Sequence, residues 1–345
     1  MALEQQGKLA EAATAWKSVT RLNPKDAGAF ASLGVVLSKQ ERYAEAAAAY
    51  RRALSLDPGL PGITLNLGLA EFKQGHFSAA ISAFNKVLAS EPSNPQARTL
   101  LGLSCYGAKR FAEAVKHLQL ALPAQPDNTE LHQVLAQSCL QAKQYSCAQD
   151  EFRWLLEKDP NSAAVHALMG QALDGLDRTP EAITEFKAAT QIAPREPNLH
   201  FGLGYLYWKS QQYDEAEKEF KLELDINDKH GQTLAYLGDI EMKRDNADQA
   251  LAWLRRAIAA QDDVRIAYID LGIILAKQKL YGDAIKALQR AVVLDPKQAD
   301  AHYRLASIYR AMGRKADADA EFAKVRQLQP KAEPGAVPGS PPDRH

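Results

Sequence analysis

Alanine recurs at one position every 34 residues along almost the whole chain of 345 residues. The alanines that keep this spacing, without an insertion or a deletion, are Ala12, Ala46, Ala80, Ala114, Ala148, Ala182, Ala216, Ala250, Ala284 and Ala318. A fixed period of this length is typical of solenoids, in which small supersecondary units stack and each unit contacts mainly its neighbours. The period therefore predicts a repeat array whose core grows along one dimension.

Residues 27–60 show what one unit contains. Leu33 and Leu37 fall on one helical face, and a second apolar set between Tyr43 and Leu54 has the i, i+3, i+4, i+7 spacing of another amphipathic helix. A proline, which is excluded from a helix interior, closes the unit. Each unit is thus predicted to be two helices of about 13 residues, roughly 20 Å long, joined by tight turns. Residues suited to cap the first helix precede it at Asp26, Asn94, Asn128 and Ser162.

A small residue in the first helix and a bulky residue in the second recur with the same period. The small residues are Gly34, Gly68, Gly102, Ala136, Gly170, Gly204, Gly238, Gly272 and Ala306. The bulky residues are Trp16, Tyr50, Phe84, Leu118, Phe152, Phe186, Phe220, Leu254, Leu288 and Phe322. Because glycine inside a helix costs about 1 kcal/mol relative to alanine, its recurrence predicts a place where two helices approach too closely for a Cβ atom.

The full pattern resembles the tetratricopeptide repeat family. It consists of Leu-Gly in the first helix, an aromatic residue at the turn, then alanine, a bulky residue and a closing proline. The turn aromatics are Tyr43, Phe77, Phe111, Tyr145, Tyr213 and Tyr281, and the closing prolines are Pro24, Pro58, Pro92, Pro126, Pro160, Pro194, Pro296 and Pro330. The resemblance implies an all-α fold, a right-handed α-solenoid superhelix of helix-turn-helix repeats.

The 34-residue pattern also divides the chain. We expect a half repeat over residues 1–26, which is the second helix of a truncated unit, and a disordered Pro/Gly-rich tail over residues 331–345. Nine tandem units lie between them, at 27–60, 61–94, 95–128, 129–162, 163–196, 197–230, 231–264, 265–298 and 299–330. Because the pattern starts in the middle of a unit, we hypothesise that the natural chain begins upstream of Met1. The sequence as it stands suggests a cytoplasmic location, whereas an upstream signal peptide or anchor would make the protein periplasmic or membrane-anchored.

Charge and motifs argue against several function classes. Lys plus Arg equal Asp plus Glu at 42 each, so nothing indicates a nucleic-acid partner, and no apolar run is long enough for direct membrane insertion. No phosphate-binding loop, nucleophile elbow, zinc-protease or Cys-x-x-Cys motif occurs. We therefore expect no catalytic residues, no cofactor and no metal, and the oligomeric state stays open.

Histidines and cysteines recur in packing positions. His132, His166, His200 and His302 share the fourth position of the first helix, about a helix-packing distance apart, which is too far for shared metal ligation. We interpret them as buried or half-buried core residues.

Cys105 and Cys139 share another position, and Cys147 lies in the helix after Cys139. Three cysteines imply no disulfide framework, so we interpret them as small apolar residues in a reducing compartment.

The resemblance implies a binding groove along the first helices. In the family, positions 2, 5, 6, 9, 12 and 13 of the first helix line a concave surface. The candidate partner-binding residues there are Leu65, Asn66, Leu69, Phe72, Leu103, Tyr106, Phe201, Tyr205, Trp208, Tyr236, Asp239, Asp270, Ile273, Tyr303 and Arg304. The alternative for the aromatic members is structural filling between neighbouring first helices.

Two specialised binding modes of the family lack their residues here. The carboxylate clamp of chaperone-tail binders needs Lys and Asn where this chain has Leu65 and Leu69, and only Asn66 fits the asparagine ladder of sugar-transferring relatives. The sequence therefore favours a non-enzymatic scaffold that binds a peptide or helix of an unidentified partner protein. The alternative is the regulatory or adaptor portion of a larger glycosyltransferase-like enzyme or of a pilus or envelope assembly machine.

Overall fold

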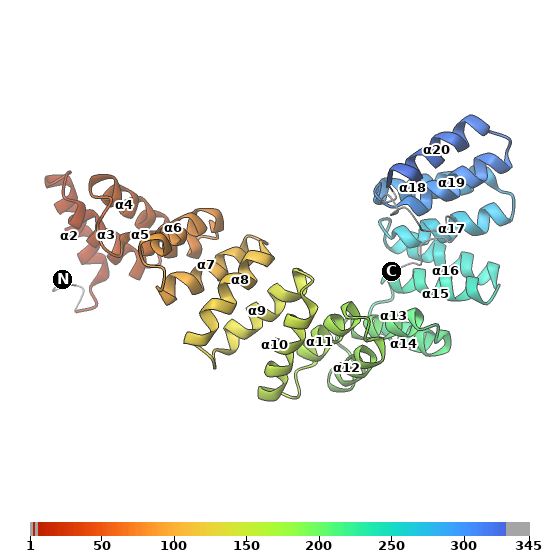
Figure 1. Ribbon diagram of the computed structural model, residues 1–345, viewed down its shortest axis with the longest axis horizontal. Helices are drawn as coiled ribbons and strands as arrows, with labels where there is room; N and C mark the ends of the chain where they lie inside the picture. Colours follow the sequence, from red (N-terminus) through yellow and green to blue (C-terminus); the bar gives the residue numbers. More distant parts are fainter. Residues whose placement is uncertain (1–2, 4–5, 329–345) are drawn as a thin grey trace, which may run out of the picture. The chain divides into compact units, whose positions relative to one another are not determined.

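The computed structural model describes residue 3 and residues 6–328, and this part of the chain contains helices and no strands. After α2 (Leu9–Leu22), first and second helices alternate along the chain (Figure 1). The first helices are α3 (Ala27–Lys39), α5 (Ile63–Lys73), α7 (Pro95–Gly107), α9 (Thr129–Gln141), α11 (Ala163–Gly175), α13 (Leu199–Lys209), α15 (Gly231–Lys243), α17 (Arg265–Lys277) and α19 (Ala299–Ala311). The second helices are α4 (Tyr43–Leu56), α6 (Phe77–Ser90), α8 (Phe111–Ala121), α10 (Tyr145–Lys158), α12 (Thr179–Ile192), α14 (Tyr213–Ile226), α16 (Ala247–Ala260), α18 (Tyr281–Leu294) and α20 (Lys315–Leu328), and a short 3-10 helix, η1 (Leu122–Ala124), follows α8.

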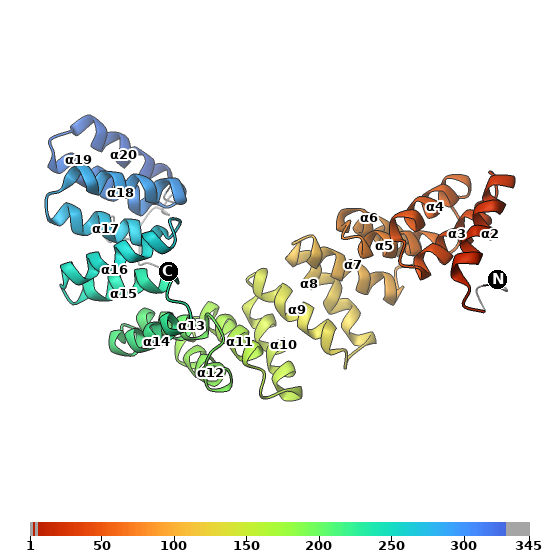
Figure 2. The same ribbon diagram turned by 180° about the vertical axis from the view of Figure 1, so that it is seen from behind.

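The chain forms two compact units, which are described separately. Unit 1 ends at Ala182 and unit 2 begins at Ile183. Inside each unit successive helical hairpins lie side by side, as Figure 2 also shows from behind. The first helices contact one another in sequence, α3 to α9 in unit 1 and α13 to α19 in unit 2. The all-α repeat fold is confirmed, whereas the division at each 34th residue stays a prediction.

At three of the four predicted positions, a side chain caps the N-terminus of a first helix. The carboxylate of Asp26 accepts a hydrogen bond from the Ala29 backbone N–H at 2.9 Å, and Asn94 and Asn128 act in the same way. Each bond satisfies one of the N–H groups that a helix start leaves without a partner. The prediction for Ser162 is wrong, because this residue precedes α11 without a side-chain cap bond.

Close helix packing explains the recurring glycines. A Cβ atom added at Gly34 would lie 2.4 Å from the Tyr50 ring, and the same atom at Gly68 would lie 2.6 Å from Phe84. Four further pairs have this contact at 2.6 to 2.8 Å: Gly102 with Leu118, Gly204 with Phe220, Gly238 with Leu254 and Gly272 with Leu288. The bulky partner always follows by 16 residues, so it belongs to the second helix of the same hairpin. The prediction of a crossing too tight for a Cβ is confirmed at these positions.

A buried carboxylate from the neighbouring helix caps the N-terminus of α13. The sequence pattern did not single it out. The N-cap residue of α13, Asn198, has a left-handed backbone (φ 70°) and makes no side-chain cap bond. Glu223 of α14 is 0% exposed, and its two carboxylate oxygens accept hydrogen bonds from the backbone N–H groups of Asn198 (2.9 Å) and Phe201 (3.2 Å). A negative charge at a helix N-terminus is favourable because the free N–H groups carry partial positive charge there. Glu223 thus replaces the missing cap from the neighbouring helix.

The two ends of the chain contain residues that the structure does not describe. The predicted disordered tail lies outside the described residues, as do four residues of the predicted half repeat. Among the helices of the described chain, none is long and apolar enough to cross a membrane.

Candidate functional site on the first helices

In unit 1 the predicted groove residues lie half-buried on two neighbouring first helices. Leu65, Asn66 and Leu69 are on α5, and Leu103 is on α7. Phe72, at the end of α5, packs edge-on against the turn aromatic Phe77 with ring centroids 5.9 Å apart. The α5 and α7 residues form an uncharged surface.

Tyr106 connects two first helices of unit 1. Its ring contacts Phe111 edge-on at 6.0 Å, and its hydroxyl donates a hydrogen bond to Gln137 Oε1 on α9 at 2.6 Å. The half-buried ring is therefore held in one orientation by both neighbours. This contact combines the two roles considered for the aromatic residues, because the ring fills space between helices and still reaches the surface.

Four rings in unit 2 pack into one cluster, which we call the aromatic face: Phe201, Tyr205 and Trp208 of α13 and Tyr236 of α15. Tyr236 lies at its centre, with centroid distances of 5.9 Å to Phe201, 5.7 Å to Tyr205 and 4.8 Å to Trp208. Edge-to-face and offset arrangements at these distances add about 0.5–1.5 kcal/mol per pair beyond the burial of area. All four side chains are half-buried, so the cluster is both packed and partly accessible.

A buried acid fixes the tryptophan of the aromatic face. The Trp208 indole N–H donates a hydrogen bond to Asp239 Oδ2 at 2.7 Å. Asp239 is only 1% exposed, and Asp270, the next predicted acid, is 0% exposed. Their burial leaves these carboxyl groups little surface for a partner, so in the free protein both are interior groups.

The remaining predicted residues lie farther along unit 2. Ile273 on α17 and Arg304 on α19 are half-buried. Tyr303 is 53% exposed, the largest exposure among the predicted aromatic residues, and its ring contacts Phe322 edge-on at 5.9 Å. The structure thus brings four of the predicted residues into one tight cluster and distributes the others along the first helices.

The recurring histidines occupy a repeated polar arrangement. His132, His200 and His302 are buried, and the Nδ1 atom of each lies 2.5 to 2.6 Å from a glutamate oxygen of the second helix, in Glu151, Glu219 and Glu321. The Nε2 atoms of His132 and His200 face the carbonyl oxygens of Pro126 and Pro194 at 2.9 and 3.1 Å. Each of these two rings therefore has an oxygen atom beside both of its nitrogen atoms. The interpretation of the four recurring histidines as buried or half-buried is confirmed, because His166 is half-buried and the other three are buried. For these three, the glutamate 19 residues later was the sequence signal for the partner.

Hydrogen bonds lower the pKa of the Glu321 carboxyl, the partner of His302. Burial raises this pKa, but the hydrogen bonds from Lys324 and His302 outweigh it.

The described residues include no group of three His, Cys, Asp or Glu side chains arranged to hold a metal ion. The contacts of His132, His200 and His302 with their glutamates join the first and second helices of each hairpin.

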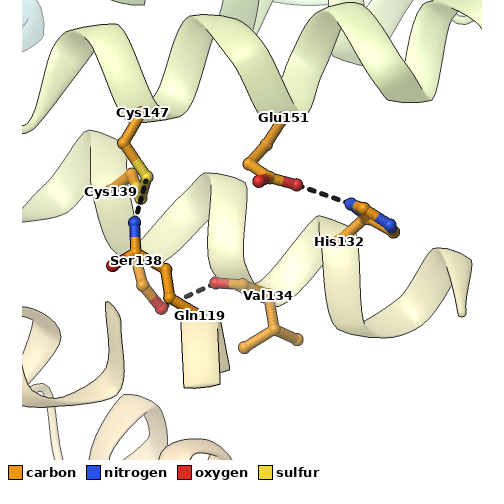
Figure 3. Close-up of a disulfide and its surroundings, with 7 residues drawn as sticks. All are labelled: Gln119, His132, Val134, Ser138, Cys139, Cys147 and Glu151. Carbon is orange, nitrogen blue, oxygen red and sulfur yellow. Dashed lines mark hydrogen bonds and ion pairs between the residues drawn. A yellow bond between two sulfur atoms is a disulfide. The ribbon is translucent and has the colours of Figure 1, made fainter. Parts of the chain in front are cut away.

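The interpretation of the cysteines is wrong for two of the three. Cys139 of α9 and Cys147 of α10 form a disulfide, with Cα atoms 5.8 Å apart, that joins the two helices of one hairpin (Figure 3). The eight-residue separation across a tight turn was visible in the sequence, but whether the two side chains face each other depends on the helix rotation. Gln119 Nε2 lies 3.6 Å from the Cys147 sulfur. Cys105 alone keeps the predicted role of a buried free cysteine, at 0% exposure.

Thiol counting distinguishes the two cysteine states. We expect iodoacetamide to modify no cysteine in the native protein at pH 8, because Cys105 is buried and burial raises the pKa of its thiol to about 11. In denaturant without a reductant one cysteine should react, and after reduction all three. Mass spectrometry of the alkylated chain gives the count. Three modified cysteines in the unreduced, denatured protein would show that the disulfide is absent.

Family models cover most of the chain. The model described as "Tetratricopeptide repeat" matches residues 1–61, 65–129, 168–230 and 201–265, and a second model with this description matches residues 106–172. A "TPR repeat" model matches residues 274–313, and another tetratricopeptide model matches residues 300–332. The chain belongs to the tetratricopeptide repeat (TPR) family. The resemblance seen in the sequence is thereby confirmed.

Solved structures similar to this TPR chain differ widely in length. Cut9, in the APC/C hetero-tetramer Cut9–Hcn1, is 16% identical with a TM-score of 0.51, and the match covers 91% of this chain and 71% of that one. Yeast Tom70 is 15% identical (TM-score 0.49, 95% and 90% covered). YrrB, a TPR protein with an unusual peptide-binding site, is 22% identical (TM-score 0.40, 52% and 93% covered). At such identities the likeness to Cut9 shows the fold alone. The comparison with curated proteins gives no match.

Proposed function

We propose that this TPR chain is a non-catalytic scaffold that binds a peptide or helix of a partner protein on the exposed side of its first helices. The aromatic face of unit 2 is the main contact surface in this proposal. TPR proteins are typically protein-interaction modules, and Cut9 is a member that occurs in a complex with another protein. The family role supports a protein-binding function, and the aromatic face supports the proposed location of the contact surface.

The single observation that carries the proposal is the mutual packing of the partly exposed rings. Tyr205, Trp208 and Tyr236 are in mutual ring contact, and Asp239 accepts a hydrogen bond from the indole of Trp208, so the contacts restrict how these rings can turn. Rings that are already ordered lose little conformational entropy when a partner covers them. Tryptophan and tyrosine are also the residues that most often dominate interface energies.

Truncation of two rings tests the proposal. We expect the Tyr205→Ala, Trp208→Ala double variant to lose its partners from a cell lysate, with at least tenfold less material captured than by wild type. A single hot-spot residue is worth about 2 kcal/mol or more, and about 1.4 kcal/mol already corresponds to a tenfold change in affinity. Affinity capture followed by quantitative mass spectrometry measures the loss.

The matched control is Trp253→Ala, which removes a half-buried tryptophan from the second helix α16 of the same unit. This variant should capture the same partners as wild type. Circular dichroism and thermal melting verify that both variants are folded. If the folded double variant keeps all wild-type partners, the aromatic face is not the contact surface.

A further inference from the structure

The regular repeat is interrupted at one place in unit 1. The second helix α8 has 11 residues, whereas every other second helix in the described chain has 14. Pro123, two residues after the end of α8, cannot donate a backbone hydrogen bond, and the chain continues as the 3-10 helix η1. The shorter helix places Ala124 and Gln125 beside the first helix α7 of the same hairpin.

A pocket of about 370 Å³ lies at this interruption. Leu69 of α5 forms one wall, Pro95, Thr99 and Leu100 of α7 form another, and Ala124 and Gln125 close the third. Gln96 completes the lining. Leu69 is one of the predicted partner-binding residues, and Gln96, Thr99 and Leu100 hold groove positions 2, 5 and 6 of their unit. Ala124 and Gln125 were not predicted, because the 34-residue pattern treats residues 122–125 as an ordinary end of a repeat. The sequence signal for these two residues was Pro123, which breaks that pattern.

The pocket is uncharged. Its walls are mostly apolar, and two of its three polar side chains have hydrogen-bond partners within the chain: Gln125 Nε2 donates to Thr99 Oγ1 at 3.3 Å, and Gln125 Oε1 accepts from Asn128 Nδ2 at 2.8 Å. Thr99 in turn donates to the Pro95 carbonyl at 3.0 Å. A charged group entering the pocket would lose its hydration without gaining a counter-charge, which is unfavourable. An apolar group loses no hydrogen bond there.

We infer that this pocket binds one bulky apolar side chain, aliphatic or aromatic, from an uncharged stretch of a partner polypeptide. The inference rests on the proposed function, because both assign a polypeptide partner, and it adds a second contact with its own side-chain specificity. Ligand pockets in proteins have volumes of about 300–1,000 Å³ and combine mostly apolar walls with a few fixed polar groups. The η1 pocket has this composition.

A phage-displayed library of random 12-residue peptides, selected on the full chain, tests the inference. We expect the enriched peptides to share one bulky apolar residue inside an uncharged stretch. Ala124→Phe, which places a ring in the pocket from an exposed position, should weaken their binding at least tenfold in fluorescence polarisation. Leu100→Arg, which places a charge there, should have the same effect.

The matched control is Ala89→Phe, which adds the same ring at an exposed alanine of α6 outside the pocket. It should bind the peptides as wild type does, and thermal melting should show that all three variants are folded. Enrichment of peptides with a charged anchor, unchanged binding by folded Ala124→Phe, or no enrichment at all would overturn the inference. Peptides that lose binding to the Tyr205→Ala, Trp208→Ala variant but not to Ala124→Phe would overturn it while supporting the proposed function.

Discussion

Replacement of Glu223 by alanine is expected to lower the free energy of unfolding of unit 2 by about 3 kcal/mol. The carboxylate is 0% exposed and accepts hydrogen bonds from the backbone N–H groups of Asn198 and Phe201. A hydrogen bond to a charged group contributes roughly 1.5–3 kcal/mol, and the substitution removes the acceptor of two backbone N–H groups at once. Chemical denaturation measures the change, and amide hydrogen exchange should become faster at the start of α13.

Asp225→Ala is the matched control, because Asp225 lies two residues later in α14 and is exposed. An acid near a helix C-terminus interacts unfavourably with the helix dipole, so this variant should be within about 0.5 kcal/mol of wild type. Glu223→Gln, which keeps one oxygen acceptor, should fall between the two. A Glu223→Ala protein as stable as the Asp225→Ala protein would show that the buried carboxylate does not stabilise the start of α13.

Gly272→Leu is expected to destabilise unit 2 by a similar amount, about 3 kcal/mol. Even a Cβ atom at this position would lie 2.6 Å from Leu288 and 3.4 Å from the backbone oxygen of Ala284. Extra methylene groups in a well-packed core cost about 1–3 kcal/mol because neighbouring side chains must leave their preferred rotamers. Leucine adds several such groups, so the cost lies at the upper end. Equilibrium unfolding in urea gives the value.

Gly282→Leu is the control within the same hairpin. No atom lies within 4 Å of a Cβ placed at Gly282, which is exposed on α18. Leucine favours helix more than glycine does by a few tenths of a kcal/mol or more, so this variant should be unchanged or slightly more stable. If both leucine variants behave alike, the close helix crossing is not what restricts position 272 to glycine.

The local architecture could be predicted because it depends on short-range patterns. The 34-residue period placed the helices, and the glycine column predicted the crossings that the structure shows at Gly34 and Gly272. The caps at Asp26 and Asn94 follow from residue type and position alone. Each of these features is set by a helix and its immediate neighbour, so the repeated spacing was sufficient to infer it.

The candidate site was predictable only in part. The spacing placed Tyr205 and Trp208 on one side of α13, but it did not show that Tyr236 from α15 packs against both of them or that Asp239 is 1% exposed. Those facts depend on the distance and rotation of the next hairpin. The pocket beside η1 was not predicted for the same reason, since its walls come from α5, α7, η1 and Gln125.

By itself, the sequence determined that this protein is a TPR array, because the period, the glycine column and the helix caps are local properties of the chain. Only the tertiary structure decided which side chains meet across helices: Cys139 with Cys147, and Glu223 with the start of α13. The physical reason is that a repeated pattern sets the helices and their neighbours. The partner of a side chain depends on helix rotation of a few tens of degrees, which a 34-residue period does not encode.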